Sequence, residues 1–232
     1  INISIPFDNA IDRVRCFYAP PLEITAFKSG EFIGSIKAGS PVNFFNISIN
    51  PHGNGTHTEC LNHISELPIT IGTALSTFHF LAQLISVDLT LLENSDRVID
   101  EASLLKSNLL SDIEAIIIRT QPKSNKKCNI DYSGTNPAYM TTAAMKHLRD
   151  RNIQHLLVDI PSVDRESDEG RLAAHHIFWD LPDNPRISCT ITELVYIPDF
   201  IPDGLYFLNL QCLDFQLDVS PSRPVLYKIL EP

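Results

Sequence analysis

The chain has 232 residues, of which 44% are hydrophobic, and its net charge is -10, with 28 acidic against 18 basic side chains. This length and composition allow a sizeable core, in one large domain or two small ones. The acidic balance disfavours nucleic acid and anionic membranes as partners, because both reward clustered Lys and Arg.

Two further classes are disfavoured by the residue pattern. The five cysteines are widely spaced and include no C-x-x-C pair, which argues against a disulfide framework and favours a reducing cytoplasm. No apolar run approaches the length of a membrane span.

The first regular element that we expect is a strand within residues 40–50. Here Phe45, Ile47 and Ile49 alternate with Asn and Ser side chains. This period of two is typical of a strand with one buried face. The strand would deliver the chain directly into a histidine-rich stretch.

That stretch, residues 51–63, contains a candidate metal site. Three of the eight histidines, His52, His57 and His63, fall within twelve residues, with Glu59 between them. Imidazoles and a carboxylate suit zinc, manganese or iron. His57 and Glu59 are two apart, so both would leave an extended backbone on one face. The alternative is a polar loop whose histidines cap neighbouring groups, and the clustering favours the metal site.

Two strands and a short helix are expected in the middle of the chain. Residues 78–92 indicate a strand, and residues 101–110 a short helix with Leu104, Leu105 and Leu109 on one face. A run of three isoleucines within residues 115–119 is typical of a strand buried on both faces.

After a polar loop, Pro137 would start a helix that reaches about Arg151, with Met145 and Leu148 inward. Residues 153–159 would form the next buried strand. The resulting βαβ unit implies parallel neighbours, and active-site residues tend to follow the carboxyl ends of such strands.

Three places in the last third of the chain contain acidic or histidine side chains that could belong to an active site. Residues 159–164 follow the second strand, and His175 and His176 come next. Adjacent histidines cannot both face one ion, so at most one is a ligand, and the alternative is a surface helix start. Glu193 lies in a strand-like segment, where a carboxylate is costly to bury unless it is paired or bound to metal. Otherwise it points to water from an edge strand.

Residues 206–217 and 225–229 indicate further strands, with residues 220–223 (Ser-Pro-Ser-Arg) as a turn between them.

Taken in order, these residues resemble the cyclase family of metal-dependent hydrolases, whose members include bacterial kynurenine formamidases and isatin hydrolases. The resemblance covers nearly the whole chain from Ala38 onward. It is carried by residues 37–43, 52–63, 117–120, 158–164, 175, 193 and 220–223. The chain departs from the family pattern by Glu59 in place of Asp, Leu61 in place of Pro, one residue inserted between His52 and His57, a longer segment before Glu193, and no N-terminal Trp-Pro-Gly element.

The resemblance implies a fold and an assembly. The fold would be a single α/β domain over residues 1–232, with a β-rich, barrel-like centre and outer helices of the swivelling β/β/α type. The assembly would be a homodimer or a higher homo-oligomer.

The resemblance also implies a site that holds one or two divalent ions, zinc first and manganese second. The first ion would be held by His52, His57 and Glu59, and the second by Glu59, His175 and Glu193. His63 matches the general acid/base of the family.

The reaction implied is hydrolysis of a small molecule. A metal-activated water would attack the carbonyl of a formamide, cyclic amide or lactone, and His63 would pass a proton to the leaving group. Two alternatives stay open. The site could be a closed structural one, although such sites favour cysteine ligands. The chain could instead be a degenerate member that binds metal or a small molecule without turnover, for which Glu59 and Leu61 are the warning signs.

Overall fold

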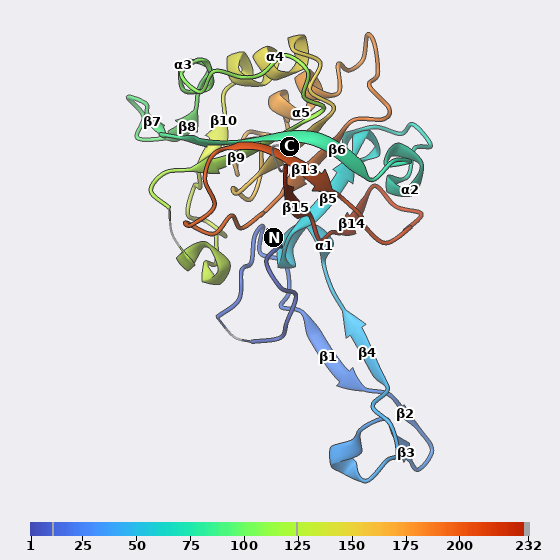
Figure 1. Ribbon diagram of the computed structural model, residues 1–232. Helices are drawn as coiled ribbons and strands as arrows, with labels where there is room; N and C mark the ends of the chain where they lie inside the picture. Colours follow the sequence, from blue (N-terminus) through green and yellow to red (C-terminus); the bar gives the residue numbers. More distant parts are fainter. Residues whose placement is uncertain (11, 124, 230–232) are drawn as a thin grey trace.

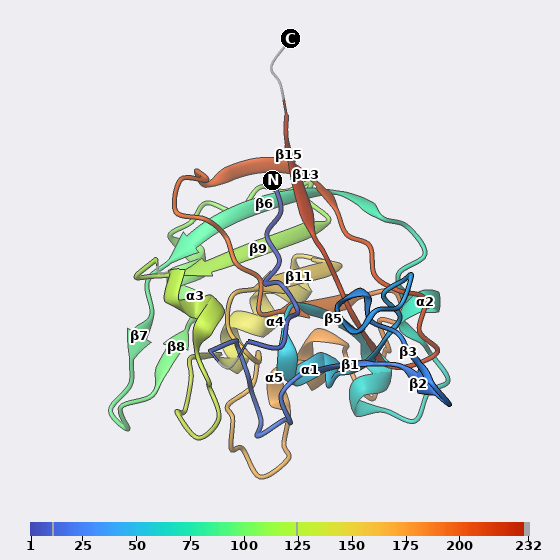
Figure 2. The ribbon, with the colours of Figure 1, turned by 90° about the horizontal axis from the view of Figure 1, so that it is seen from below.

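A curled eight-stranded sheet forms the centre of the computed structural model, which describes residues 1–10, 12–123 and 125–229 (Figures 1 and 2). The spatial order of its strands is β14 (Val219–Pro221), β5 (His57–Cys60), β12 (Thr190–Glu193), β11 (His155–Val158), β9 (Ala115–Thr120), β6 (His79–Val87), β13 (Gly204–Asn209) and β15 (Val225–Lys228). The four strands from β12 to β6 are parallel, and antiparallel pairs flank them on both sides. The predicted mixed α/β class with a β-rich centre is confirmed.

Shorter elements surround this sheet. The remaining strands are β1 (Glu23–Ala26), β2 (Lys28–Ser29), β3 (Phe32–Ile33), β4 (Phe45–Ser48), β7 (Thr90–Leu91), β8 (Arg97–Ile99) and β10 (Tyr139–Met140). The helices are α1 (Pro51–Asn54), α2 (Ile71–Ala74), α3 (Glu101–Leu105), α4 (Thr142–Asp150) and α5 (Ala173–Phe178), with 3-10 turns η1 (Ile36–Ala38), η2 (Leu61–Ile64) and η3 (Asn125–Asn129).

The predicted βαβ unit is present as β9, α4 and β11. All six residues of β9 are buried, and β9 and β11 are parallel neighbours. The predicted start of the helix at Pro137 is wrong, because the next residues form β10 and pair with β8. Thr141 caps the helix instead, since its side chain accepts a hydrogen bond from the backbone N–H of Ala144. Asn152, with a positive φ of 57°, follows the end of α4.

Two other sequence predictions need correction. The helix predicted over residues 101–110 ends at Leu105, and only Leu104 of its expected apolar face is fully buried, whereas Leu105 is exposed. The turn predicted over residues 220–223 begins as β14, an edge strand that pairs with β5.

The two faces of the central sheet pack against different parts of the chain. Because side chains alternate along a strand, Ile116 and Ile118 point to one face and Ile117 to the other. The first face packs against residues of α4 and α5, including Met145 and Phe178. The second faces another core, to which β6, β13 and β15 contribute. Helix α5 therefore lies on the same face of the sheet as Ile116.

An extended arm, residues 23–48, projects away from this body (Figure 1). Strands β1 and β4 pair antiparallel along its length, and β2 and β3 lie near its tip. A strand was predicted here and β4 is present, but its expected burial is wrong: all four of its residues are exposed.

The five cysteines are all free thiols. None of the described helices is long and apolar enough to cross a membrane.

Candidate metal centre

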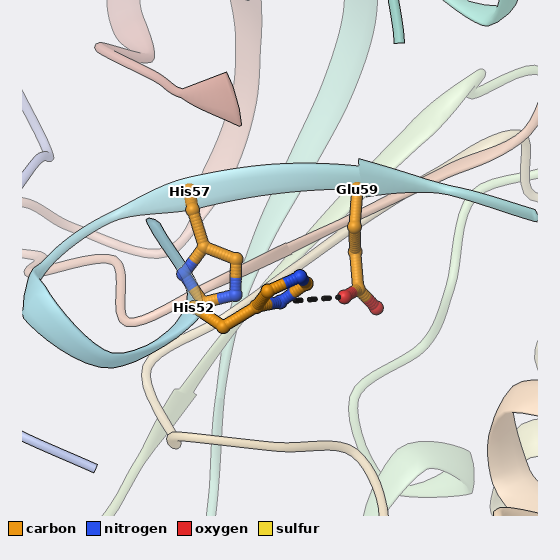
Figure 3. Close-up of side chains that lie close together, drawn as sticks. All are labelled: His52, His57 and Glu59. Atoms are coloured by element: carbon orange, nitrogen blue, oxygen red, sulfur yellow. Dashed lines mark ion pairs between the residues drawn. The ribbon is translucent and has the colours of Figure 1, made fainter. Parts of the chain in front are cut away.

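Strand β5 presents the first two side chains of the site. His57 and Glu59 are both buried, and both leave the same face of the strand (Figure 3). On the neighbouring strand β12, Glu193 pairs in register with His57 and so shares that face. His57 Nε2 lies 3.4 Å from Glu193 Oε2. Glu193 is thus buried beside an imidazole rather than directed to water.

Helix α1 brings His52 to the same place. The side chain of Asn50 caps this short helix by accepting a hydrogen bond from the Gly53 N–H at 3.0 Å. A side chain at position 53 would overlap Ala19, so this turn requires glycine. His52 Nδ1 comes to 3.4 Å from Glu59 Oε2, the pair marked in Figure 3. One potential ligand atom from each of His52, His57 and Glu59 lies within 4.8 Å of the others.

Helix α5 supplies one of the two adjacent histidines. His175 is buried, and its Nε2 lies 2.9 Å from Glu59 Oε1 and 3.9 Å from Glu193 Oε1. Its other ring nitrogen, Nδ1, lies 2.6 Å from Asp164 Oδ2. Asp164 also accepts hydrogen bonds from the backbone N–H groups of residues 174 and 175. His176, the next residue, is exposed.

His63, in the turn after β5, lies at the open side of the cluster. Its Nε2 is 3.7 Å from Glu59 Oε2, and its Nδ1 is 3.1 Å from Asp218 Oδ2. The same oxygen of Asp218 lies 3.2 Å from His52 Nε2. The side chains of His52 and His63 are 24% and 29% exposed, so solvent reaches the site here.

The structure thus brings together all six residues that were predicted as metal ligands or as the acid/base, and it adds two acidic residues to which the sequence assigned no role. Asp164 and Asp218 each hold a histidine through a carboxylate. Asp164 had a signal, since it follows the carboxyl end of β11 and lies in a segment that carried the family resemblance. Asp218 had none, because it precedes a segment that looked like a turn and is in fact β14, the partner of β5.

The charges in the cluster are strongly coupled. Burial opposes protonation of His52 and His175, but the neighbouring carboxylates outweigh it and raise the pKa of each imidazole to about 10. Burial likewise opposes ionisation of Glu59, yet His63 and His175 hold the pKa of its carboxyl well below the ordinary value. Hydrogen bonds from His52 and His63 lower the pKa of Asp218. The carboxylates therefore favour positive charge in the site. Without a metal, protons on the histidines supply this charge, and a divalent ion would displace those protons.

Two buried atoms fit a metal ion in particular. His57 Nε2 and Glu59 Oε2 are buried and have no hydrogen-bond partner among the described residues. The other ring nitrogen of His57, Nδ1, lies 2.9 Å from the carbonyl oxygen of Gly55, which fixes the ring with Nε2 toward the cluster. Buried polar atoms are costly when unpaired, and imidazole nitrogen with carboxylate oxygen suits a transition-metal ion. The donor set therefore fits a divalent metal.

The two histidines of α5 allow a direct test of the site. We expect His175→Ala to reduce the amount of metal bound per chain, because its imidazole meets Glu59 inside the cluster. His176→Ala should leave metal content at the wild-type value, since its side chain is exposed. Elemental analysis of both purified variants measures this, and a loss of metal in His176→Ala alone would contradict the assignment.

Known proteins that resemble this chain were found by sequence and by structure. Residues 1–165 match the Cyclase family, described as "Putative cyclase". No match to a curated protein was found.

Among solved structures, a protein described as a potential metal-dependent hydrolase with cyclase activity superposes with a TM-score of 0.68 at 18% identity, covering 97% of this chain and 96% of the other. Isatin hydrolase A from Ralstonia solanacearum gives 0.67 at 17% identity, covering 97% and 89%. Isatin hydrolase A from Labrenzia aggregata, bound to benzyl benzoate, gives 0.62 at 15% identity, covering 97% and 91%. At such identities these structures establish a shared fold. Because the family match spans well over half of the residues and the fold agrees along nearly the whole length, this chain belongs to the cyclase family.

Proposed function

We propose that this protein is a metal-dependent hydrolase that attacks a carbonyl group in a small molecule. The observation that carries the proposal is the cluster itself, in which four histidines and four carboxylates converge from five segments of the chain. Two of its buried ligand atoms, His57 Nε2 and Glu59 Oε2, lack a hydrogen-bond partner among the described residues. Such a pairing of buried carboxylates and perturbed histidines in one place is typical of a catalytic metal site.

Two ligand sets are available for a divalent ion, zinc ahead of manganese. His52, His57 and Glu59 would hold the first ion, since their potential ligand atoms lie close together. Glu59 would also serve a second ion together with His175 and Glu193. His63 lies near enough to Glu59 and His175 to compete as a ligand. We assign it instead to proton transfer because it is among the exposed members of the cluster, where a substrate can reach it.

A divalent ion bound at this site would supply an activated water and polarise the substrate carbonyl. The protein's own residues do the rest. Glu59 and Glu193 bring the negative charge that retains a cation, and the Asp164 carboxylate orients the ring of His175. His63 donates a proton from Nε2 to the leaving group, while Asp218 holds its Nδ1. Asp218 thus acts as a positioning residue for the acid.

The proposed substrate is a formamide, a cyclic amide or a lactone. In each of these the bond to be cleaved joins a carbonyl carbon to a nitrogen or oxygen that needs a proton as it leaves. The half-exposed His63 can meet that atom from the solvent side of the site. Support for a cyclic amide also comes from the two isatin hydrolases that share the fold.

The test is turnover of a panel of formamides, cyclic imides and lactones, with the metal content of the same preparation measured in parallel. We expect hydrolysis of at least one class, its loss on treatment with a chelator, and its return when zinc or manganese is added back. Hydrolysis that persists after the metal has been removed would contradict the proposal. A fully metallated protein that turns over none of the panel would favour a degenerate member of the family.

A further inference from the structure

A cavity of about 360 Å³ lies at the carboxyl ends of strands β9 and β11, and we call it the β9/β11 cavity. Residues at or directly after these strand ends line it, namely Thr120, Gln121 and Asp159. Because β9 and β11 are parallel neighbours, their carboxyl ends meet at one edge of the sheet, where ligands of parallel sheets usually bind. No residue of the metal cluster is among the described residues that line this cavity.

The walls of the β9/β11 cavity are largely apolar. They include three prolines and three aliphatic side chains: Pro122, Pro137, Pro161, Leu89, Ile130 and Ile160. A volume of about 360 Å³ is near the lower end of the range of about 300–1,000 Å³ that is typical of small-molecule pockets. Such pockets combine apolar walls with a few polar groups that orient the ligand. The cavity therefore suits a small molecule with an apolar body.

One largely buried ion pair in the wall is satisfied by the protein itself. Lys127 Nζ lies 2.6 Å from Asp159 Oδ2 and donates to the carbonyl oxygen and the hydroxyl of Thr120, at 3.0 and 2.7 Å. These three contacts use all the N–H bonds of the ammonium group. Asp159 in turn accepts a hydrogen bond from the backbone N–H of Thr120. The pair therefore ties the two strand ends together and leaves no donor for a ligand.

Two other polar groups in the wall have no such partner. Arg97, in β8, is exposed, and its guanidinium makes no ion pair or hydrogen bond with the described residues. The Tyr132 hydroxyl likewise makes no hydrogen bond within the described part of the chain. Burial, followed by the charge of Asp159, raises the pKa of this hydroxyl, so it stays protonated and can donate. Because Lys127 and Asp159 are paired, Arg97 gives the cavity a positive charge in a chain whose net charge is -10.

We propose that the β9/β11 cavity is a second small-molecule site, which binds a carboxylate with an apolar body. The ligand carboxylate accepts hydrogen bonds from the Arg97 guanidinium and the Tyr132 hydroxyl, and its body packs against the apolar walls. One unpaired cation and one neutral donor match a carboxylate better than a phosphate group, which carries more charge and more acceptor oxygens. This site is separate from the proposed hydrolytic one, and its ligand does not have to be a substrate.

The probe for the test is phenylacetate, which combines one carboxylate with an apolar ring. Calorimetric titration of the purified protein should detect saturable binding of phenylacetate. Phenylacetamide keeps the shape of the probe without its charge, and acetate keeps the charge without the ring. We expect each of these two compounds to bind at least about tenfold more weakly, because one loses the charged hydrogen bond and the other the apolar contact.

Three variants assign the binding to this cavity. Arg97→Gln should raise the dissociation constant of phenylacetate at least about tenfold, because a hydrogen bond between charged groups is lost at an exposed position that the fold does not depend on. Tyr132→Phe removes only the hydroxyl and should weaken binding by about two- to tenfold. Arg223→Gln is the matched control, since Arg223 is also exposed but does not line the cavity, and its dissociation constant should equal that of the wild type.

Nuclear magnetic resonance locates the ligand without any substitution. Backbone amide signals of residues 127–136 should shift on titration with phenylacetate, whereas those of residues 57–63 should not. Shifts confined to residues 57–63 would place the carboxylate on the metal cluster and overturn the proposal. It is equally wrong if phenylacetate does not bind, if Arg97→Gln binds it as tightly as the wild type, or if Arg97→Gln and Arg223→Gln weaken binding to the same extent.

Discussion

Replacing His57 with Ala should strip the metal from the first ligand set and reduce hydrolysis to background. The imidazole is buried, and the contact of its Nδ1 with the Gly55 carbonyl fixes it, while its Nε2 has no hydrogen-bond partner among the described residues. Outer partners of metal ligands alone are worth about 10- to 100-fold in affinity, so loss of a direct ligand should cost at least that much. Metal analysis after dialysis and initial rates on a working substrate provide the measurement.

A matched control comes from another histidine of the same sheet. His155, in β11, is also buried, but its Nδ1 lies 2.9 Å from the hydroxyl of Thr190 and it belongs to no cluster of metal-capable residues found in the described chain. His155→Ala removes an equal volume and should lower thermal stability while keeping the metal. If His57→Ala retained wild-type metal content, the assignment of the site would be wrong.

His63→Ala should separate proton transfer from metal binding. A general acid or base contributes about 10²- to 10⁴-fold to rate, so we expect a loss of that size in kcat/KM with the bound metal unchanged. The loss should be greatest for amides, whose nitrogen needs a proton to leave, and smaller for activated esters. Rates on a matched amide and ester, with metal analysis of the same samples, make the comparison.

Asp218→Asn offers a companion to this variant. It keeps the size of the side chain but weakens the hold on His63 Nδ1, so we expect a smaller loss of rate with the same preference for amides. A His63→Ala protein that lacks metal would identify His63 as a ligand. If His63→Ala kept full activity on an amide, the catalytic acid would be another residue of the cluster.

Local sequence patterns were sufficient for the parts of this molecule that depend on neighbours along the chain. The spacing of His57 and Glu59 placed them on one face because the alternation of a strand is independent of its partners. The isoleucine run of β9 and the helix before β11 indicated parallel pairing. A strand buried on both faces is typical of a parallel sheet, and parallel neighbours need a crossover such as a helix. These features followed from periodicity alone.

Features that depend on distant partners could not be predicted in the same way. Asp218 meets His63 because β14 pairs with β5, a contact across 155 positions of sequence that no local pattern encodes. The helix start at Pro137 was wrong because pairing of β10 with β8 outweighed the preference of proline for a first helical turn. The alternation in β4 predicted a strand correctly, but the predicted burial of one face was wrong, because the strand lies in the projecting arm and all four of its residues are exposed.

The position of β5 divides the metal centre into a rigid half and an adjustable half. His57 and Glu59 lie on a strand with hydrogen-bonded neighbours on both sides, and Glu193 is fixed in β12 beside them. His52 and His63 come from short turns at the solvent side. Ion binding would therefore require little reorganisation of the strands, because their donors are already in place. The Gly-Asn-Gly turn at residues 53–55 belongs to this adjustable half. Changes in such a turn would reshape the entrance to the site while the potential ligand atoms on the strands keep their places.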